Sequence, residues 1–291
     1  MPVTISTPLF TQHSRSWRDN RFVYPVISRR SKGLSIGVNL NPDQACNFDC
    51  VYCSVDRTNQ ASAPTVRSVD LEGVRAELDH LLGLAVSGAI WNEPPFDRTP
   101  SELRRLNDVA FSGDGEPTSY AGFGDACRLA AEVIRWHNAS AKIVVITNAT
   151  LLNRPEVQSA LAFLDSVPSQ IWAKLDAGTQ DYYALIERTK IPLSRVLDNL
   201  LLTGRLRPIT IQSMFLRYRG EGPSAVEIEA YLQRLRDLIA GGCRISLVQI
   251  YTVARATAEA EATPLTTAEV DAITAKVQAL GIAAEAYYGP G

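Results

Sequence analysis

Short apolar segments alternate with segments of helical periodicity along most of this 291-residue sequence. We predict strands at 34–40, 108–112, 142–147, 171–176, 209–216 and 245–251. Helices are predicted near 70–86, 125–137, 155–164, 194–203, 224–240 and 267–280. Several strands are almost continuously hydrophobic, which is typical of parallel strands covered on both faces. Six consecutive βα units predict an α/β fold with a parallel sheet, either open or curled into a partial barrel.

The remaining segments divide the chain into three parts. Residues 1–33 form a basic N-terminal arm, residues 34–252 form the core, and residues 253–291 form a C-terminal linker, helix and edge strand near 283–288. Within the core, residues 88–107 are predicted as an insertion loop with a short helix starting near Pro100; after the core, residues 254–262 are predicted as a linker or flexible loop.

Two of the predicted helices begin with a capping-box pattern. Ser224 is followed by Glu227, and Thr266 by Glu269. In this pattern the hydroxyl and the carboxylate each accept a hydrogen bond from the other residue's backbone N–H, so both pairs predict helix starts.

Composition and charge exclude several classes of protein. The sequence has 29 basic and 31 acidic residues, so no strong overall field favours nucleic acid or an anionic membrane. It has no apolar run of about 18 residues, and its first residues do not resemble a secretory signal, so we expect no membrane span. An odd count of five cysteines favours a reducing cytoplasm over a disulfide framework.

The N-terminal arm departs from this neutral balance. Residues 1–32 contain six basic residues and one acidic residue, a net charge of +5. The arm is interpreted either as a solvated segment folded over the core or as a contact for phosphate or an RNA backbone.

Three cysteines, Cys46, Cys50 and Cys53, lie within eight residues, directly after the first predicted strand. The residues before them, Asn41-Pro42-Asp43, favour a loop that can bring thiolates to one centre. Three thiolates could hold an iron–sulfur cluster, bind zinc with a fourth ligand, or form a disulfide and one free thiol. A cluster with three protein ligands leaves one iron open, and an open position implies a small molecule bound to the metal.

This CxxxCxxC loop, with the aromatic Tyr52 before its last cysteine, resembles the signature of radical S-adenosylmethionine (SAM) enzymes. The resemblance covers residues 34–252 and implies a partial (β/α)6 TIM-like barrel. It implies that Cys46, Cys50 and Cys53 ligate a [4Fe–4S] cluster, that SAM chelates the fourth iron, and that Tyr52 lies near the adenine. An electron from the cluster would cleave SAM and produce a 5′-deoxyadenosyl radical, which abstracts hydrogen from a substrate.

The second predicted strand ends in a glycine-rich turn that contains Gly113, Asp114, Gly115 and Glu116. Glycines past a strand let a backbone approach a ligand, although an ordinary strand-to-helix turn has the same composition. In its position after the cysteine loop, the turn resembles the family's GGE motif, which binds the amino group of SAM. Because Asp114 separates the glycines, either Asp114 or Glu116 could face SAM.

Polar residues also end the third, fourth and fifth predicted strands. Trp172, Lys174 and Asp176 share one face of the fourth strand. Lys174 and Asp176 form either a buried structural pair or, as the resemblance implies, contacts to the SAM carboxylate and ribose. Thr147 and Asn148 end the third strand, and the resemblance makes Asn148 an alternative ribose contact.

On the fifth and sixth strands, Gln212, Gln249 and Tyr251 are candidates for SAM or substrate contacts, because ligands of α/β folds lie at the carboxyl ends of strands. Gln212 and Gln249 could equally form structural hydrogen bonds. Cys127 and Cys243 are interpreted as small buried hydrophobes. The histidines are interpreted as structural; they are His13, His80 and His137.

The combined motifs resemble the radical SAM branch that contains the wyosine-base-forming enzymes of tRNA. Those enzymes use a second cluster bound by upstream cysteines, and no cysteine precedes Cys46 here, so the reaction stays open. We expect a radical SAM enzyme with an unidentified substrate. The basic arm favours RNA or a phosphorylated metabolite over a neutral substrate. A low-potential donor, flavodoxin or ferredoxin, is an implied partner. The alternatives are a zinc-stabilised binding module without redox chemistry and a cluster that serves only electron transfer.

Overall fold

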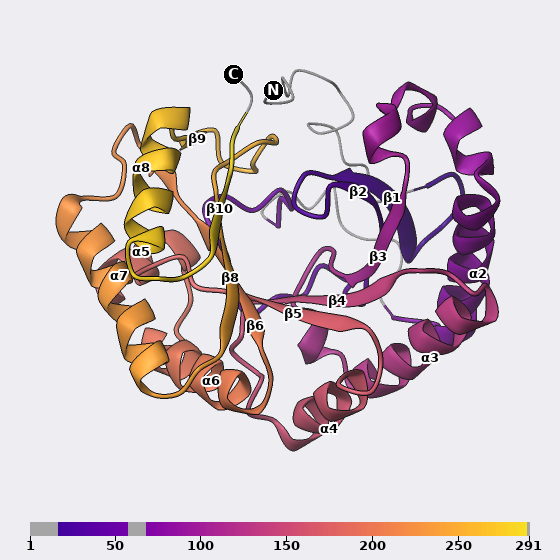
Figure 1. Cartoon of the computed structure of the whole chain (residues 1–291), viewed down its shortest axis with the longest axis horizontal. Helices are drawn as coiled ribbons and strands as arrows, with labels where there is room; N and C mark the ends of the chain where they lie inside the picture. The colour runs from indigo at the N-terminus through magenta and orange to yellow at the C-terminus, as the bar shows by residue number, and fades with distance from the viewer. Residues whose placement is uncertain (1–16, 58–67, 290–291) are drawn as a thin grey trace.

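The computed structural model describes residues 17–57 and 68–289, and its centre is a curled eight-stranded sheet (Figure 1). The strands follow the spatial order β1-β2-β3-β4-β5-β6-β8-β10. All neighbours from β2 to β10 are parallel, whereas β1 is antiparallel to β2. The strands of this sheet are β1 (Val23–Ser28), β2 (Gly33–Val38), β3 (Leu106–Phe111), β4 (Lys142–Thr147), β5 (Ser169–Lys174), β6 (Ile209–Met214), β8 (Ile245–Tyr251) and β10 (Ala284–Tyr287).

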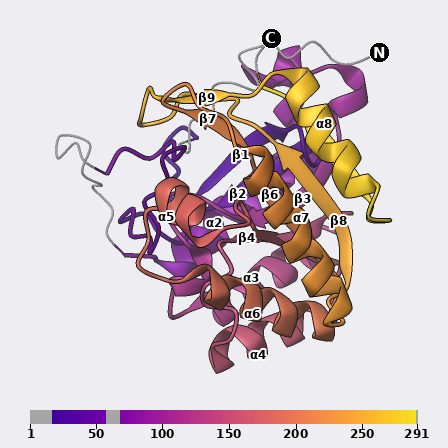
Figure 2. The ribbon, with the colours of Figure 1, turned by 90° about the vertical axis from the view of Figure 1, so that its left-hand side faces the viewer.

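Helices cover the outer face of the curve (Figures 1 and 2), and a cavity lies on its inner face, here called the lumen. They are α2 (Leu71–Ser87), α3 (Phe123–Trp136), α4 (Pro155–Leu164), α5 (Gln180–Glu187), α6 (Leu193–Leu206), α7 (Ala225–Ala240) and α8 (Thr267–Gln278). The predicted partial barrel is confirmed, because the six predicted strands form consecutive parallel neighbours within this sheet. No helix in the described part of the chain is long and apolar enough to cross a bilayer.

The core lies between the sheet and its helices and follows the alternation of each strand. On β5, Ala173 packs outward and is fully buried, whereas Trp172 and Lys174 face the lumen, as predicted. Burying an aliphatic side chain fully stabilises the folded state by about 1.5–3 kcal/mol relative to leaving it exposed. The apolar side chains on the outer face therefore stabilise the strands that carry the polar side chains of the lumen.

Residues 23–28, predicted as part of the N-terminal arm, form strand β1 at one edge of the sheet. Val23 and Ile27 are each 1% exposed, so this segment belongs to the core. Pro25 argues against a strand in the sequence, because proline cannot donate a backbone hydrogen bond. An edge strand tolerates a proline, since one of its sides needs no hydrogen bonds to a neighbouring strand. Residues 1–16 of the predicted arm, His13 among them, lie outside the described residues.

Strands β1 and β10 are the two edges of the sheet, and side chains connect them. In the β1–β2 turn, Arg29 donates a hydrogen bond to the carbonyl of Tyr288, just after β10. The Lys32 ammonium lies 3.1 Å from the Glu285 carboxylate on β10. The strand predicted near 283–288 is thus β10, which pairs with β8 in parallel.

The two predicted capping boxes have different outcomes. At the start of α8, Thr266 and Glu269 form the complete reciprocal box. At the start of α7, Ser224 accepts from the backbone N–H of Glu227, but the Glu227 carboxylate accepts from Gly178 N–H at 2.5 Å instead. The second half of that box was therefore a wrong prediction, because a neighbouring loop offers the carboxylate buried donors.

Two further elements differ from the prediction, and the insertion agrees with it. The segment 209–216 divides into β6 and β7 (Leu216–Tyr218), and β7 pairs with β9 (Ala262–Pro264) at the end of the expected linker (Figure 2). The short helix α5 was not predicted. The insertion 88–107 contains three 3-10 turns, of which Ser101–Leu103 is at the helix predicted near Pro100.

Candidate functional site

A cavity of about 290 Å³ opens inside the curled sheet and is lined by the ends of β5 and β6 and by the segments that follow β2, β3, β4 and β8. Its walls combine the cysteine loop, the glycine-rich turn and the ends of the neighbouring strands. Apart from Asp176 and Gln249, every predicted site residue lies in these walls: Cys46, Cys50, Tyr52, Cys53, Gly113, Asp114, Gly115, Glu116, Thr147, Asn148, Lys174, Gln212 and Tyr251. The fold therefore brings together residues that are more than 160 positions apart in the sequence.

The cysteine loop follows β2 and is anchored to the end of α5. The backbone N–H of Val51 donates to the carbonyl of Ile186 at 2.9 Å, and that of Asp49 donates to the carbonyl of Glu187 at 3.1 Å. These contacts fix a segment that has neither helix nor strand of its own.

The three thiols of the loop line the cavity, and their surroundings differ. Burial raises the pKa of Cys46 and, still more, of Cys50. The Cys50 thiol donates to the Glu187 carboxylate at 2.6 Å, whereas the Cys53 sulfur accepts from the Arg57 guanidinium at 3.2 Å.

Within residues 17–57 and 68–289, no group of Cys, His, Asp and Glu side chains is already arranged around a metal position. The donor set nevertheless fits an iron–sulfur cluster, because three soft sulfur ligands from one irregular loop line one cavity. Coordination to a metal would also offset the free-energy cost of holding thiolate charges in a buried place.

Tyr52 lies at the centre of a buried polar network. Its hydroxyl contacts the carboxylates of Asp176 and Glu187, the latter at 3.0 Å, and accepts from the Lys174 ammonium at 3.0 Å. Asp176 also accepts from the backbone N–H of Met214 at 2.7 Å. Tyr52 thus lies between the two residues that the sequence suggested as a direct pair, and it connects them to the cysteine loop.

Glu187 is a site residue that the sequence analysis missed. It is 1% exposed, and burial, followed by the charge of Asp176, raises the pKa of its carboxyl well above the ordinary value. A protonated carboxyl can share a hydrogen bond with Asp176, so the two acids lie close together without two full negative charges. No motif around Glu187 indicates this position, which only the packing of α5 against the cysteine loop creates.

Glu116 and Asn148 hold the walls of the cavity together. The Glu116 carboxylate accepts from the Thr147 hydroxyl and from the backbone N–H of Asn148, both at 2.7 Å. The Asn148 amide donates to the side-chain carbonyl of Asn47 at 2.6 Å. The glycine-rich turn, the end of β4 and the cysteine loop are therefore connected through buried hydrogen bonds.

Asp114 and Arg57 make a second connection between the same walls. The Asn39 amide donates to the Asp114 carboxylate at 2.6 Å, and the Arg57 guanidinium donates to the Asp114 carbonyl at 2.5 Å. Arg57 also contacts Cys53, so one side chain bridges the glycine-rich turn and the cysteine loop. The sequence analysis missed Arg57, although its position four residues after Cys53 is a usable signal.

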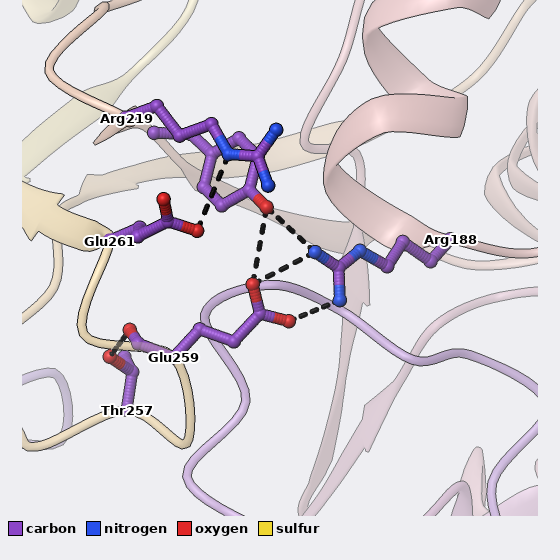
Figure 3. Close-up of polar contacts among 6 residues, drawn as sticks. Arg188, Arg219, Thr257, Glu259 and Glu261 are labelled. Carbon is purple, nitrogen blue, oxygen red and sulfur yellow. Dashed lines mark hydrogen bonds and ion pairs between the residues drawn. The ribbon is translucent and has the colours of Figure 1, made fainter.

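The segment 252–261 covers the cysteine loop and is fastened there by the contacts in Figure 3. Arg188 forms a two-pronged ion pair with Glu259, and the Tyr218 hydroxyl lies between them, accepting from Arg188 at 2.7 Å. The backbone N–H of Ala258 donates to the carbonyl of Cys53 at 2.8 Å. Residues 252–257 line the cavity, so a segment expected as a linker forms one of its walls.

We predict that Glu259→Gln loosens this segment without unfolding the protein. The ion pair with Arg188 is partly exposed, so its loss should cost about 1 kcal/mol or less of stability. Hydrogen exchange should show faster exchange of the Ala258 amide. The matched control is Glu261→Gln, which removes the more exposed contact to Arg219 and should leave that amide unchanged. Equal exchange rates in both variants and the parent would contradict the prediction.

Comparison with known proteins identifies the family. Residues 40–221 match the family model described as the radical SAM superfamily. The chain belongs to this superfamily. Radical SAM proteins use SAM and a [4Fe–4S] cluster, and the three cysteines of this chain lie at the motif position.

Three curated relatives share 27–28% identity with the radical SAM chain. A GTPase Obg from Brachyspira hyodysenteriae matches over 59% of this chain and 21% of its own length. UPF0026 protein MJ1312 from Methanocaldococcus jannaschii matches over 54% and 44%, and UPF0026 protein slr1464 from Synechocystis over 68% and 61%. The matched regions thus cover less than two thirds of each relative.

One solved structure shows a similar fold at low identity. The structure of anSMEcpe with bound AdoMet, which is SAM, has a TM-score of 0.50 at 15% identity and covers 75% of this chain and 52% of its own. A structure of TYW1 with a lysine–pyruvate adduct has a TM-score of 0.41 at 17% identity and covers 77% and 66%.

Proposed function

We propose that this radical SAM enzyme holds its [4Fe–4S] cluster on Cys46, Cys50 and Cys53 and binds SAM in the cavity beside them. The supporting observation is that the cysteine loop and the polar ends of β3 to β6 share one cavity. When bound and reduced, the cluster supplies the electron that cleaves the SAM sulfonium and yields a 5′-deoxyadenosyl radical for hydrogen abstraction.

We assign the SAM contacts from the walls of this cavity. The carbonyls of Gly113 and Gly115 are the proposed acceptors for the amino group, and the Lys174 ammonium is the proposed partner of the carboxylate. Asn148 is the proposed ribose contact, and Tyr52 is placed near the adenine. Asp176, which contacts Tyr52 and the backbone of Met214, is proposed to hold Tyr52 in place rather than to touch SAM.

The proposed reductant is a flavodoxin or ferredoxin, because reductive cleavage of a sulfonium needs the low end of the range of cluster potentials. The proposed compartment is the cytoplasm, since all five cysteines are free thiols in the structure. The substrate is proposed to enter the lumen beside SAM.

The test is anaerobic reconstitution with iron and sulfide, followed by incubation with SAM and dithionite. We expect brown protein with about four irons per chain and release of 5′-deoxyadenosine. Zinc alone in anaerobically purified protein would overturn the proposal in favour of a zinc-stabilised binding module. A cluster that forms without any release of 5′-deoxyadenosine would restrict the chain to electron transfer.

A further inference from the structure

Two arginines enter the cavity from a part of the fold that the SAM assignment does not use. Arg29 and Arg30 lie in the turn between β1 and β2, at the opposite end of β2 from the cysteine loop. The Arg30 guanidinium lies over two aromatic rings, 4.9 Å from the ring centre of Tyr251 and 5.8 Å from that of Trp172. Cation–π contacts of this kind hold the guanidinium in place without using its N–H donors.

The positive charge of Arg30 is not matched by an ion pair. Within residues 17–57 and 68–289, no carboxylate forms an ion pair with Arg30 and no acceptor is hydrogen-bonded to it. Asp108, an acid in the same cavity wall, accepts from the hydroxyls of Ser31 and Ser35 and interacts with the charge of Arg30 without a hydrogen bond to it.

The other acid near this turn, Glu285, already has partners. Glu285 is in contact with Lys32 and with the Tyr287 hydroxyl. Burial, followed by the neighbouring charge of Arg30, lowers the pKa of Arg29 to about 10, because two like charges lie near each other in a partly desolvated place. An anion bound between them would relieve this repulsion.

A second, independent observation also indicates a ligand in the lumen. Gln212 is fully buried and lines the cavity, and its side-chain oxygen has no hydrogen-bond partner in the structure. Its amide nitrogen is already bound to Gln249 at 2.7 Å. A buried acceptor without a partner is costly, so this oxygen is suited to a ligand that brings an N–H or O–H donor.

We infer that Arg30, supported by Arg29, binds an anionic group of a small organic substrate, a carboxylate or a phosphate, and that the same substrate carries a donor for Gln212. This inference rests on the proposed function, which places SAM at the cysteine end of the cavity. A planar guanidinium stacked on aromatic rings presents its N–H edge, and that edge matches the two oxygens of a carboxylate or phosphate. Because Arg30 lies inside the lumen, a single terminal group fits the site better than the backbone of a polymer.

The test is calorimetric titration of the full chain, purified anaerobically, with inorganic phosphate and, separately, with succinate. We expect saturable binding of at least one anion at one site per chain, and the tighter anion identifies the class of the group. Arg30→Gln should weaken this binding about tenfold or more, and Arg30→Lys, which keeps the charge but loses the planar fork, should weaken it less. The matched control, Arg236→Gln, removes an exposed surface arginine and should leave binding unchanged.

Three results would overturn the inference. The first is no saturable binding of either anion, and the second is equal affinity in the parent and Arg30→Gln. The third is loss of anion binding when the titration is repeated with saturating SAM, because the anion would then occupy the site of the SAM carboxylate. The measurement needs neither reduction nor SAM cleavage. A failed release of 5′-deoxyadenosine therefore argues only against the proposed function, and failed anion binding only against the present inference.

Discussion

Cys50→Ala is expected to abolish both cluster binding and SAM cleavage. The change removes one of three proposed iron ligands, and two thiolates from one loop cannot hold the cluster that three hold. Iron content after anaerobic reconstitution should fall from about four per chain to near zero, with loss of the brown colour. Release of 5′-deoxyadenosine in the presence of dithionite should fall to the level without protein.

The matched control for this experiment is Cys127→Ala. Cys127 is fully buried in α3 and is no part of the cavity, so its replacement removes a sulfur without touching the proposed ligand set. This variant should keep its iron and its activity, with a modest loss of stability because a small buried side chain becomes smaller. Full iron content in Cys50→Ala would contradict the assignment of this cysteine.

Gly115→Ala is expected to displace the cysteine loop. A Cβ at position 115 would overlap the carbonyl oxygen of Ala45, the residue just before Cys46, and would lie 2.7 Å from the Cβ of Asn41. A backbone carbonyl cannot rotate away as a side chain does, so the loop itself must shift. We expect a loss of about 1–3 kcal/mol in the free energy of unfolding, and a strong loss of reconstituted iron.

Gly124→Ala in α3 controls for the added methyl group. A Cβ there would approach other atoms no closer than 3.6 Å, which is ordinary van der Waals contact. Because alanine is favoured over glycine by about 1 kcal/mol in a helix, this variant should be as stable as the parent or more stable. Thermal unfolding and iron analysis of both variants check the pair. Normal iron content in Gly115→Ala would show that the loop tolerates displacement.

The parts of the fold that could be predicted are those with long periodic patterns. Strand β4 and strand β8 have the predicted bounds, and α4 begins and ends at the predicted residues. Their apolar runs are continuous because parallel strands are covered on both faces, so the pattern reflects burial directly. The alternation on β5 likewise placed Trp172 and Lys174 in the lumen.

The parts that could not be predicted depend on contacts between distant segments. Strand β1 contains a proline and follows a charged stretch, and only its pairing with β2 makes it a strand. The helix α5 is too short to show a clear period. Glu187 and Arg57 became site residues through their packing against the cysteine loop, and local sequence does not encode such contacts.

The open side of the sheet has a consequence for access to the interior. Edge strands β1 and β10 are joined by Arg29 at a carbonyl and by the exposed Lys32–Glu285 pair, which is worth about 1 kcal/mol or less. In a closed barrel, opening the wall between two strands would break a row of backbone hydrogen bonds. Here side-chain contacts of Arg29 and Lys32 close the seam, so β1 and β10 can separate without breaking backbone hydrogen bonds between strands, and salt, which screens the Lys32–Glu285 pair, should weaken this closure.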